Sequence, residues 1–225
     1  MLWFGILVGE FILLFISSKF FIRLLSHVLL RFTHSQSLTI QLLSLLFLPG
    51  VAIHELAHAL MASVLFVPVG DIEFLPQLVD GGVKLGSVGI GLTDPLRRSI
   101  IGVAPVLFGL LIIFLASFYL SPNATSFLQL LSSDFGIWKA IALFYILFQI
   151  SNTMFSSKKD MEGVLAVGVA LIIIVVLVVV LGYRPNISFS SAVVSQFQQL
   201  ALFLLLPLWV NLLGIVGMIL LSKTR

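Results

Sequence analysis

Charge and cysteine are both scarce in this sequence. Its 225 residues include 12 Lys or Arg, 9 Asp or Glu and no Cys, while 60% of the chain is hydrophobic. Only 9% of residues are charged, against roughly 25% in soluble domains, so too few polar groups remain to cover a water-exposed surface. A soluble globule is therefore excluded. The lack of Cys excludes disulfides, thiolate metal sites and a Cys nucleophile, and a net charge of +3 gives no reason to expect nucleic acid as a partner.

Apolar runs of membrane-spanning length make up most of the chain. About 20 apolar residues cross a bilayer, and we predict an all-α polytopic membrane protein with six transmembrane helices and a small β-hairpin at 67–93, between the second and third. One membrane domain then comprises a first span with a basic segment (1–36), a core with the hairpin (37–163) and two C-terminal spans (164–225). The predicted spans are residues 2–17, 37–66, 99–120, 137–155, 164–182 and 200–221.

A basic segment follows the first span. Its basic and titratable residues recur every three or four positions, which places them on one face of a helix. Such a segment can lie in the headgroup plane or extend the first helix beyond the bilayer, and a lipid-specific site or a histidine metal site is the alternative. The residues on this face are Lys19, Arg23, His27, Arg31 and His34.

The distribution of Lys and Arg predicts how the chain is oriented. With the N-terminus inside, seven of these residues lie on the cytoplasmic side and five on the other, as the positive-inside rule favours. The basic residues at 19–31 argue against this orientation. We expect a multi-pass protein of a prokaryotic cell membrane with the N- and C-termini in the cytoplasm.

A hairpin and a helix start are marked by their turn residues. Residues 72–79 and 83–92 flank the sequence Asp-Gly-Gly at 80–82, which favours a tight turn between two strands. Asp94 and Pro95 then predict the N-cap and the first residue of the next helix.

One motif places ionisable groups inside an apolar run. Residues 54–58 read His-Glu-Leu-Ala-His, or H-E-x-x-H. On a helix, His54 and His58 share a face and can reach one metal ion, while Glu55 can act as general base toward a water that the metal activates. Intramembrane ionisable groups are costly and therefore usually functional. The alternative is a polar cluster in which the three side chains satisfy one another.

A catalytic zinc site needs a third protein ligand beyond the two histidines. The other acidic residues are in the first span, near the hairpin, or in the loop predicted on the far side of the membrane. Asp160 and Glu162 follow the fourth span, on the side where the second span also ends. Zinc accepts either carboxylate, so both stay candidates.

The H-E-x-x-H motif in a membrane helix, the following hairpin and a later Asn-x7-Asp resemble the site-2 protease family of intramembrane zinc metalloproteases. The resemblance covers roughly 38–163. It implies an endopeptidase that uses one Zn²⁺ per chain and cleaves membrane-spanning protein substrates within the lipid bilayer. The implied zinc ligands are His54, His58 and Asp160, and the implied catalytic residues are Glu55 as base and Asn152 as a contact to substrate or oxyanion.

The sequence departs from the family pattern around the third ligand. Phe155 stands where the family has Pro, and 159–163 reads Lys-Asp-Met-Glu-Gly in place of Leu-Asp-Gly, which keeps Glu162 as the alternative ligand. Asn152 can instead pair helices. The hairpin can hold an extended substrate segment by β-augmentation or simply cap the core. The alternative functions are a membrane metal-ion transporter and an inactive metal-binding relative that binds client helices.

Overall fold

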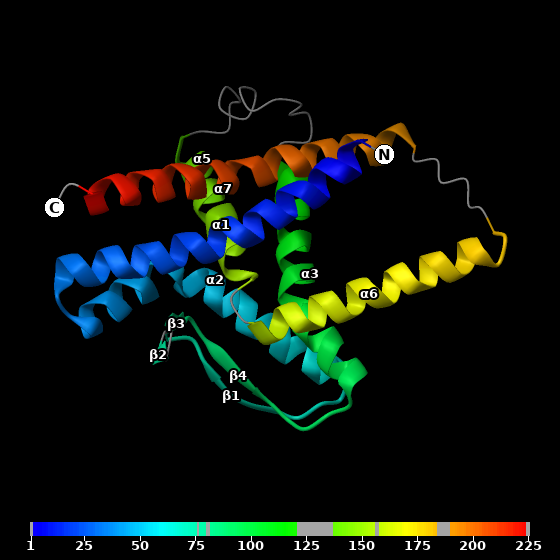
Figure 1. The fold of residues 1–225 in the computed structure, drawn as a ribbon, viewed down its shortest axis with the longest axis horizontal. Helices are drawn as coiled ribbons and strands as arrows, with labels where there is room; N and C mark the ends of the chain where they lie inside the picture. Colours follow the sequence, from blue (N-terminus) through cyan, green and yellow to red (C-terminus); the bar gives the residue numbers. More distant parts are fainter. Residues whose placement is uncertain are drawn as a thin grey trace.

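The structure, a computed structural model, describes residues 2–75, 77–79, 82–120, 137–155, 158–183 and 190–223. In this part of the chain there are six helices, and a small two-part hairpin lies at one edge of the helices, next to α2 (Figure 1). Five of the helices are long and apolar enough to cross a membrane, and α5, with 17 residues, is shorter. The predicted all-α polytopic membrane fold is confirmed. The helices are α1 Leu2–Thr33, α2 Gln36–Val64, α3 Pro95–Leu120, α5 Ile137–Thr153, α6 Lys158–Val180 and α7 Ser191–Lys223.

Helix α1 runs without interruption through the first predicted span and the basic segment. Its 32 residues correspond to about 48 Å at 1.5 Å per residue, which exceeds the roughly 30 Å hydrocarbon core of a bilayer. The basic segment therefore extends the first helix and does not form a separate one. The chain then turns within two residues, and the Ser35 side chain caps α2 by accepting a hydrogen bond from the Leu38 amide.

Helices α1 and α7 pack side by side in the same direction. Near their starts, the rings of Phe4 and Phe197 lie 6.3 Å apart. Near their ends, Arg31 Nη1 donates to the Ser222 carbonyl oxygen at 3.1 Å. The N- and C-termini accordingly lie at opposite ends of this helix pair (Figure 1).

Helix α5 supplies hydrogen-bond donors to α2 close to Pro49. Proline lacks an N–H and so interrupts the hydrogen-bond ladder of a helix. Three residues earlier, the Leu46 carbonyl accepts from the Tyr145 hydroxyl at 3.2 Å and also from the Gln149 side-chain amide. These contacts keep backbone polar groups of α2 paired inside the protein, as a bilayer requires.

The same two helices approach each other closely at Gly50. A Cβ at this position would lie 2.7 Å from Thr153 Oγ1 and 2.9 Å from the Gln149 carbonyl oxygen. Small residues commonly allow such backbone approach in membrane helices. One turn away, the rings of Phe47 and Phe148 stack with centroids 6.1 Å apart.

The predicted hairpin is present between α2 and α3, within the range 67–93, and its first strand begins at residue 69, three residues before the strand predicted at 72–79. It consists of two antiparallel ladders, and the register of the outer ladder shifts between the pairs Val69–Ile90 and Ile72–Val88. Residues 80 and 81 of the predicted turn lie outside the described residues. The outer ladder pairs β1 Val69–Glu73 with β4 Ser87–Ile90, and the inner one pairs β2 Gln77–Val79 with β3 Gly82–Lys84.

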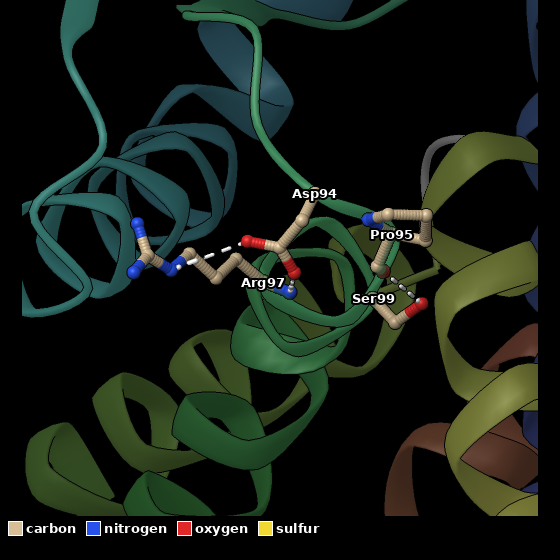
Figure 2. A network of polar contacts seen from close by, with 4 residues as sticks. All are labelled: Asp94, Pro95, Arg97 and Ser99. Carbon is tan, nitrogen blue, oxygen red and sulfur yellow. Dashed lines mark hydrogen bonds and ion pairs between the residues drawn. The ribbon is translucent and has the colours of Figure 1, made fainter.

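The predicted start of α3 is confirmed in detail (Figure 2). Asp94 Oδ1 accepts from the Arg97 backbone amide at 3.0 Å, and Asp94 Oδ2 lies 3.3 Å from Arg97 Nε. The amide hydrogen bond is the main reason that the pKa of Asp94 lies below its ordinary value. The charged carboxylate therefore caps the helix, while Ser99 Oγ donates back to the Pro95 carbonyl.

One core cluster lies where α1, α3, α5 and α7 meet, and a second lies between α1, α2, α5 and α7, whereas α6 is largely exposed along its aliphatic length. An aliphatic surface of this kind is compatible with lipid. The largest fully buried apolar side chains include Leu14, Ile113, Leu147, Phe155 and Phe203.

We predict that Gly50→Ala lowers the melting temperature of the full-length protein in detergent. The added methyl group would press on the Gln149 backbone carbonyl, which cannot rotate away. Gly168→Ala is the matched control, because no atom lies within 4 Å of a Cβ there, and both changes bring the same gain in helix propensity, about 1 kcal/mol. Equal melting temperatures for the two variants would contradict the close packing of α2 on α5.

Candidate metal centre

Helix α2 places the H-E-x-x-H motif on its inward face. His54, Glu55 and His58 are 3%, 4% and 6% exposed, whereas Leu56 and Leu60 are about half exposed. The 3.6-residue period puts positions 54 and 58 together and turns the leucines toward lipid. Three ionisable side chains are thus buried within a membrane helix, where each needs a specific partner.

The two imidazoles of the motif face each other. His54 Nε2 and His58 Nε2 lie 3.2 Å apart, and the ring planes make an angle of 83°. Two nitrogens bound to one tetrahedral zinc ion at about 2.0–2.1 Å stand roughly 3.3 Å apart. The observed separation therefore fits two ligands of one ion.

A backbone contact from α3 orients the second histidine. His58 Nδ1 lies 2.8 Å from the carbonyl oxygen of Ile101. Because a carbonyl only accepts, Nδ1 carries the proton and the lone pair of the neutral ring is at Nε2, facing His54. Zinc-binding histidines usually donate their other ring N–H to such an acceptor, which fixes the tautomer and the ring orientation.

The hairpin lies directly against Glu55. A Cβ on Gly86, between β3 and β4, would be 2.6 Å from Val51 Cγ1 and 3.0 Å from Glu55 Oε1. It would also be 3.0 Å from the Glu73 carbonyl oxygen on the opposite strand. Only glycine fits here, so the hairpin backbone forms one wall beside the carboxylate.

Asp160 is the third residue of α6, and its side chain lies outside the described part of the structure. One turn later, α6 crosses α3, where a Cβ on Gly163 would be 2.9 Å from the Ser99 carbonyl oxygen. Ser99 is two residues before Ile101, whose carbonyl contacts His58. Gly163 of α6 and His58 of α2 therefore contact the same turn of α3.

The described carboxylates do not complete the histidine pair. Among the side chains that the structure describes, no group of three or more His, Asp or Glu is arranged to hold a metal ion. Glu162 is one of these side chains, and it is exposed. The structure therefore does not bring Glu162 together with the histidines, and Asp160 stays a prediction.

Asn152 forms part of a contact between three helices. It is fully buried, and its Nδ2 donates to the Phe148 carbonyl at 2.9 Å and to Asn211 Oδ1 of α7 at 3.0 Å. Asn211 Nδ2 in turn lies 3.5 Å from Ser17 Oγ of α1. Through these hydrogen bonds Asn152 pairs α5 with α7, which is the alternative role that the sequence left open for it. Within the described residues, its Oδ1 atom has no hydrogen-bond partner.

Phe155 anchors the turn that follows α5. Its buried ring packs edge-on against Phe11 at 4.9 Å and Phe15 at 5.5 Å between centroids. The family that the sequence resembles has a rigid proline at this position. Here an aromatic cluster with α1 holds the chain shortly before Asp160.

Two contributors to the site were missed by reasoning from the sequence. The sequence does not indicate the Ile101 carbonyl, because every residue has a backbone carbonyl and only the packing of α3 on α2 brings this one to His58. Gly86 was visible only as one of several glycines in an irregular hairpin. Its contact with Glu55 depends on how the hairpin folds back over α2.

No protein-family model, no curated protein and no solved structure matches this chain. Two buried imidazoles with facing Nε2 atoms, one of them oriented by a carbonyl, form a candidate zinc centre, and the buried Glu55 follows the first of them in the sequence.

We predict that the purified full-length protein binds one zinc ion per chain and that His54→Ala and His58→Ala abolish this binding. Asp160→Ala should weaken zinc affinity by more than about 100-fold, because loss of an outer-shell partner alone costs 10–100-fold. The measurement is metal content after dialysis against competing chelators.

Glu162→Ala is the matched control, since it removes a carboxylate from the same helix, two residues away. Unchanged affinity in this variant is expected. Loss of zinc in Glu162→Ala with retention in Asp160→Ala would make Glu162 the third ligand. A wild-type protein without zinc would contradict the metal centre itself.

Proposed function

We propose that this protein is an intramembrane zinc endopeptidase that hydrolyses peptide bonds within or next to transmembrane segments of membrane proteins. The observation that carries the proposal is the pair of facing Nε2 atoms of His54 and His58, 3.2 Å apart, buried beside Glu55 in a membrane helix.

The proposed ligands are His54 and His58 through Nε2, with Asp160 as the third. The proton on His58 Nδ1 is held by the Ile101 carbonyl, so Nε2 needs no deprotonation before it binds. Zinc, when bound, acts as a Lewis acid that activates water and polarises the peptide carbonyl. Three protein ligands leave one position open for this chemistry.

Glu55 is the proposed general base. Its carboxylate accepts a proton from the attacking water as the new bond forms between the water oxygen and the peptide carbonyl carbon. It then returns that proton to the leaving nitrogen as the C–N bond breaks. Burial between α2 and the hairpin keeps bulk water from competing for this proton.

The hairpin is the proposed place where substrate is held. A transmembrane helix shields its peptide bonds with its own hydrogen bonds, so the segment to be cleaved has to be extended. An extended segment can add to an exposed strand by backbone pairing. Gly86 lies next to Glu55, so a segment paired with this hairpin would pass close to the base.

We predict that Glu55→Gln lowers cleavage of a reconstituted transmembrane substrate by roughly 10²–10⁴-fold, the usual contribution of a general base. Zinc content should stay unchanged, because glutamine keeps the shape of the side chain and Glu55 is not a ligand. Glu73→Gln is the control, since this carboxylate is exposed and accepts a hydrogen bond from Ser87 Oγ at 3.0 Å within the hairpin.

Each alternative function gives a different result in the same preparation. Cleavage by Glu55→Gln at the wild-type rate would refute the proposed mechanism. Zinc uptake into liposomes that survives Glu55→Gln would identify a transporter. Stoichiometric zinc without cleavage of any substrate by the wild type would identify an inactive, metal-binding relative.

The orientation in the membrane is a separate question. Cytoplasmic N- and C-termini need an even number of crossings, and therefore α1 and α7 in opposite directions. The contacts between Phe4 and Phe197 and between Arg31 and Ser222 give α1 and α7 the same direction. If both cross the bilayer, the two termini lie on opposite faces.

We predict that single cysteines at Ser37 and Ser222 react with a membrane-impermeant maleimide from the same face. The native chain has no Cys, so each variant carries one thiol, and both positions are exposed. Ser191→Cys, at the start of α7, is the control and should react from the other face. Labelling of Ser37→Cys and Ser222→Cys from opposite faces would contradict this prediction and support the orientation with both termini in the cytoplasm.

A further inference from the structure

We propose that a substrate of this protein places a large aliphatic side chain in the space that Leu85 of the hairpin now fills. The proposal rests on the proposed endopeptidase function and deepens it, because it names the feature of the substrate that the same site recognises. It follows from the burial of Leu85, from the position of Gly86 beside Glu55 and from the helices that surround Leu85.

Leu85 is the residue through which the hairpin enters the helix bundle. Among the hairpin side chains that the structure describes, at 69–75 and 84–90, Leu85 alone is buried, with 4% of its surface exposed. It belongs to the core cluster between α1, α2, α5 and α7. We call the other buried members of this cluster the Leu85 site, and they are Phe21, Leu43, Phe47, Val51, Phe148 and Met218.

The walls of the Leu85 site are held together by helices. The ring of Phe148 on α5 stacks on Phe47 of α2 with centroids 6.1 Å apart, and it meets Phe21 of α1 edge-on at 5.6 Å. These contacts join three helices and do not involve the hairpin. We therefore expect the Leu85 site to keep its aromatic walls when Leu85 moves out of it.

The residue after Leu85 lies against the proposed base. A Cβ on Gly86 would be 2.6 Å from Val51 Cγ1 and 3.0 Å from Glu55 Oε1. Val51 belongs to the Leu85 site, and Glu55 follows it by one turn on the same face of α2. An extended chain with one side chain in the Leu85 site therefore carries its next residue past Glu55, as the hairpin does here.

The hairpin is attached more firmly at its base than at Leu85. At the base, the buried Val67 packs with Ala62 of α2 and Ile101 of α3. From there the hairpin extends along α2 (Figure 1), and Leu85 is its one buried side chain among those described at 69–75 and 84–90. Segments with few buried apolar contacts open most readily, so Leu85 can leave the bundle while the base stays in place.

The energetics of this exchange select the incoming side chain. A leucine that moves from the bundle into lipid stays in apolar surroundings, so the main loss is the packing of the Leu85 site and the cavity left there. An aliphatic side chain of similar volume from another chain restores this packing. Alanine is too small to do so, and a charged side chain would be buried without a partner.

Disulfide crosslinking to the full-length protein in liposomes tests the Leu85 site without catalysis. The native chain has no Cys, so Glu55→Cys carries one thiol next to Gly86 and lacks the proposed base, and it is used without metal. The probes are synthetic transmembrane peptides with an Ala/Val core, lysines at both ends and one central Leu-Cys or Ala-Cys pair. We expect the Leu-Cys peptide to crosslink at least tenfold faster, since one methylene group in an apolar pocket changes selectivity by about 10–200-fold.

Changes at Leu85 are made in the same Glu55→Cys protein. Truncation of a buried leucine shifts an equilibrium by about 30-fold or more, so with Leu85→Ala the Leu-Cys peptide should crosslink at least fivefold faster. Leu85→Met keeps the side-chain volume and should leave the rate unchanged. Leu14→Ala is the matched control, because it truncates a fully buried leucine of the other core cluster, and it should not raise the rate. Melting temperatures in detergent check that each variant is folded.

Three results would overturn the proposal. They are equal crosslinking of the two peptides, an unchanged rate in Leu85→Ala, and an equal rise in Leu14→Ala. Cleavage is measured separately with the zinc-loaded wild type, on peptides that carry a central Leu-Ala or Ala-Ala pair. Cleavage of both peptides at the same rate would refute only the Leu85 site, whereas crosslinking that depends on leucine, without any cleavage, would refute only the proposed enzyme.

Discussion

The hydrogen bond between His58 Nδ1 and the Ile101 carbonyl oxygen joins the packing of the helices to the chemistry of the candidate site. In a bilayer, no water is present to satisfy a ring N–H that loses its partner. The contact therefore fixes the position of α3 against α2 and, at the same time, directs the second ring nitrogen toward His54. Helix α6 crosses α3 at the same turn, through Gly163, so α3 contacts both α2 and α6 there.

The opposite side of the site is held by polar and aromatic contacts of different kinds. Asn152, Asn211 and Ser17 connect α5, α7 and α1 through buried amide and hydroxyl groups, and Phe155 packs on α1 just beyond them. Contacts of this kind replace the hydrophobic driving force, which is absent between helices in lipid. They fix the end of α5, and with it the start of the short connection to α6.

The sequence predicted the fold and the motif but not the contacts that complete the site. Span length and apolar composition located the helices, and Asp94 and the hairpin were identified because caps and turns depend on local residues. The 32-residue length of α1 was not predicted, because Lys19 and Arg23 end the apolar run without ending the helix. The four-residue spacing of His54 and His58 predicted that their side chains share one face of the helix. The contacts of Ile101 and Gly86 depend on tertiary packing, which no local sequence pattern encodes.

The contact at Gly86 has a consequence for access to the site. Val51, Glu55 and Glu73 leave no space for even a methyl group between the hairpin and α2, so in this arrangement a polypeptide chain cannot pass between them. If the proposed endopeptidase activity is correct, a substrate segment that enters beside Glu55 has to displace residues 85 and 86 from α2, or arrive from the side of α3 and α6. The closed contact would then act as a filter on entry, admitting only segments that gain enough from pairing with the hairpin to separate it from the helix.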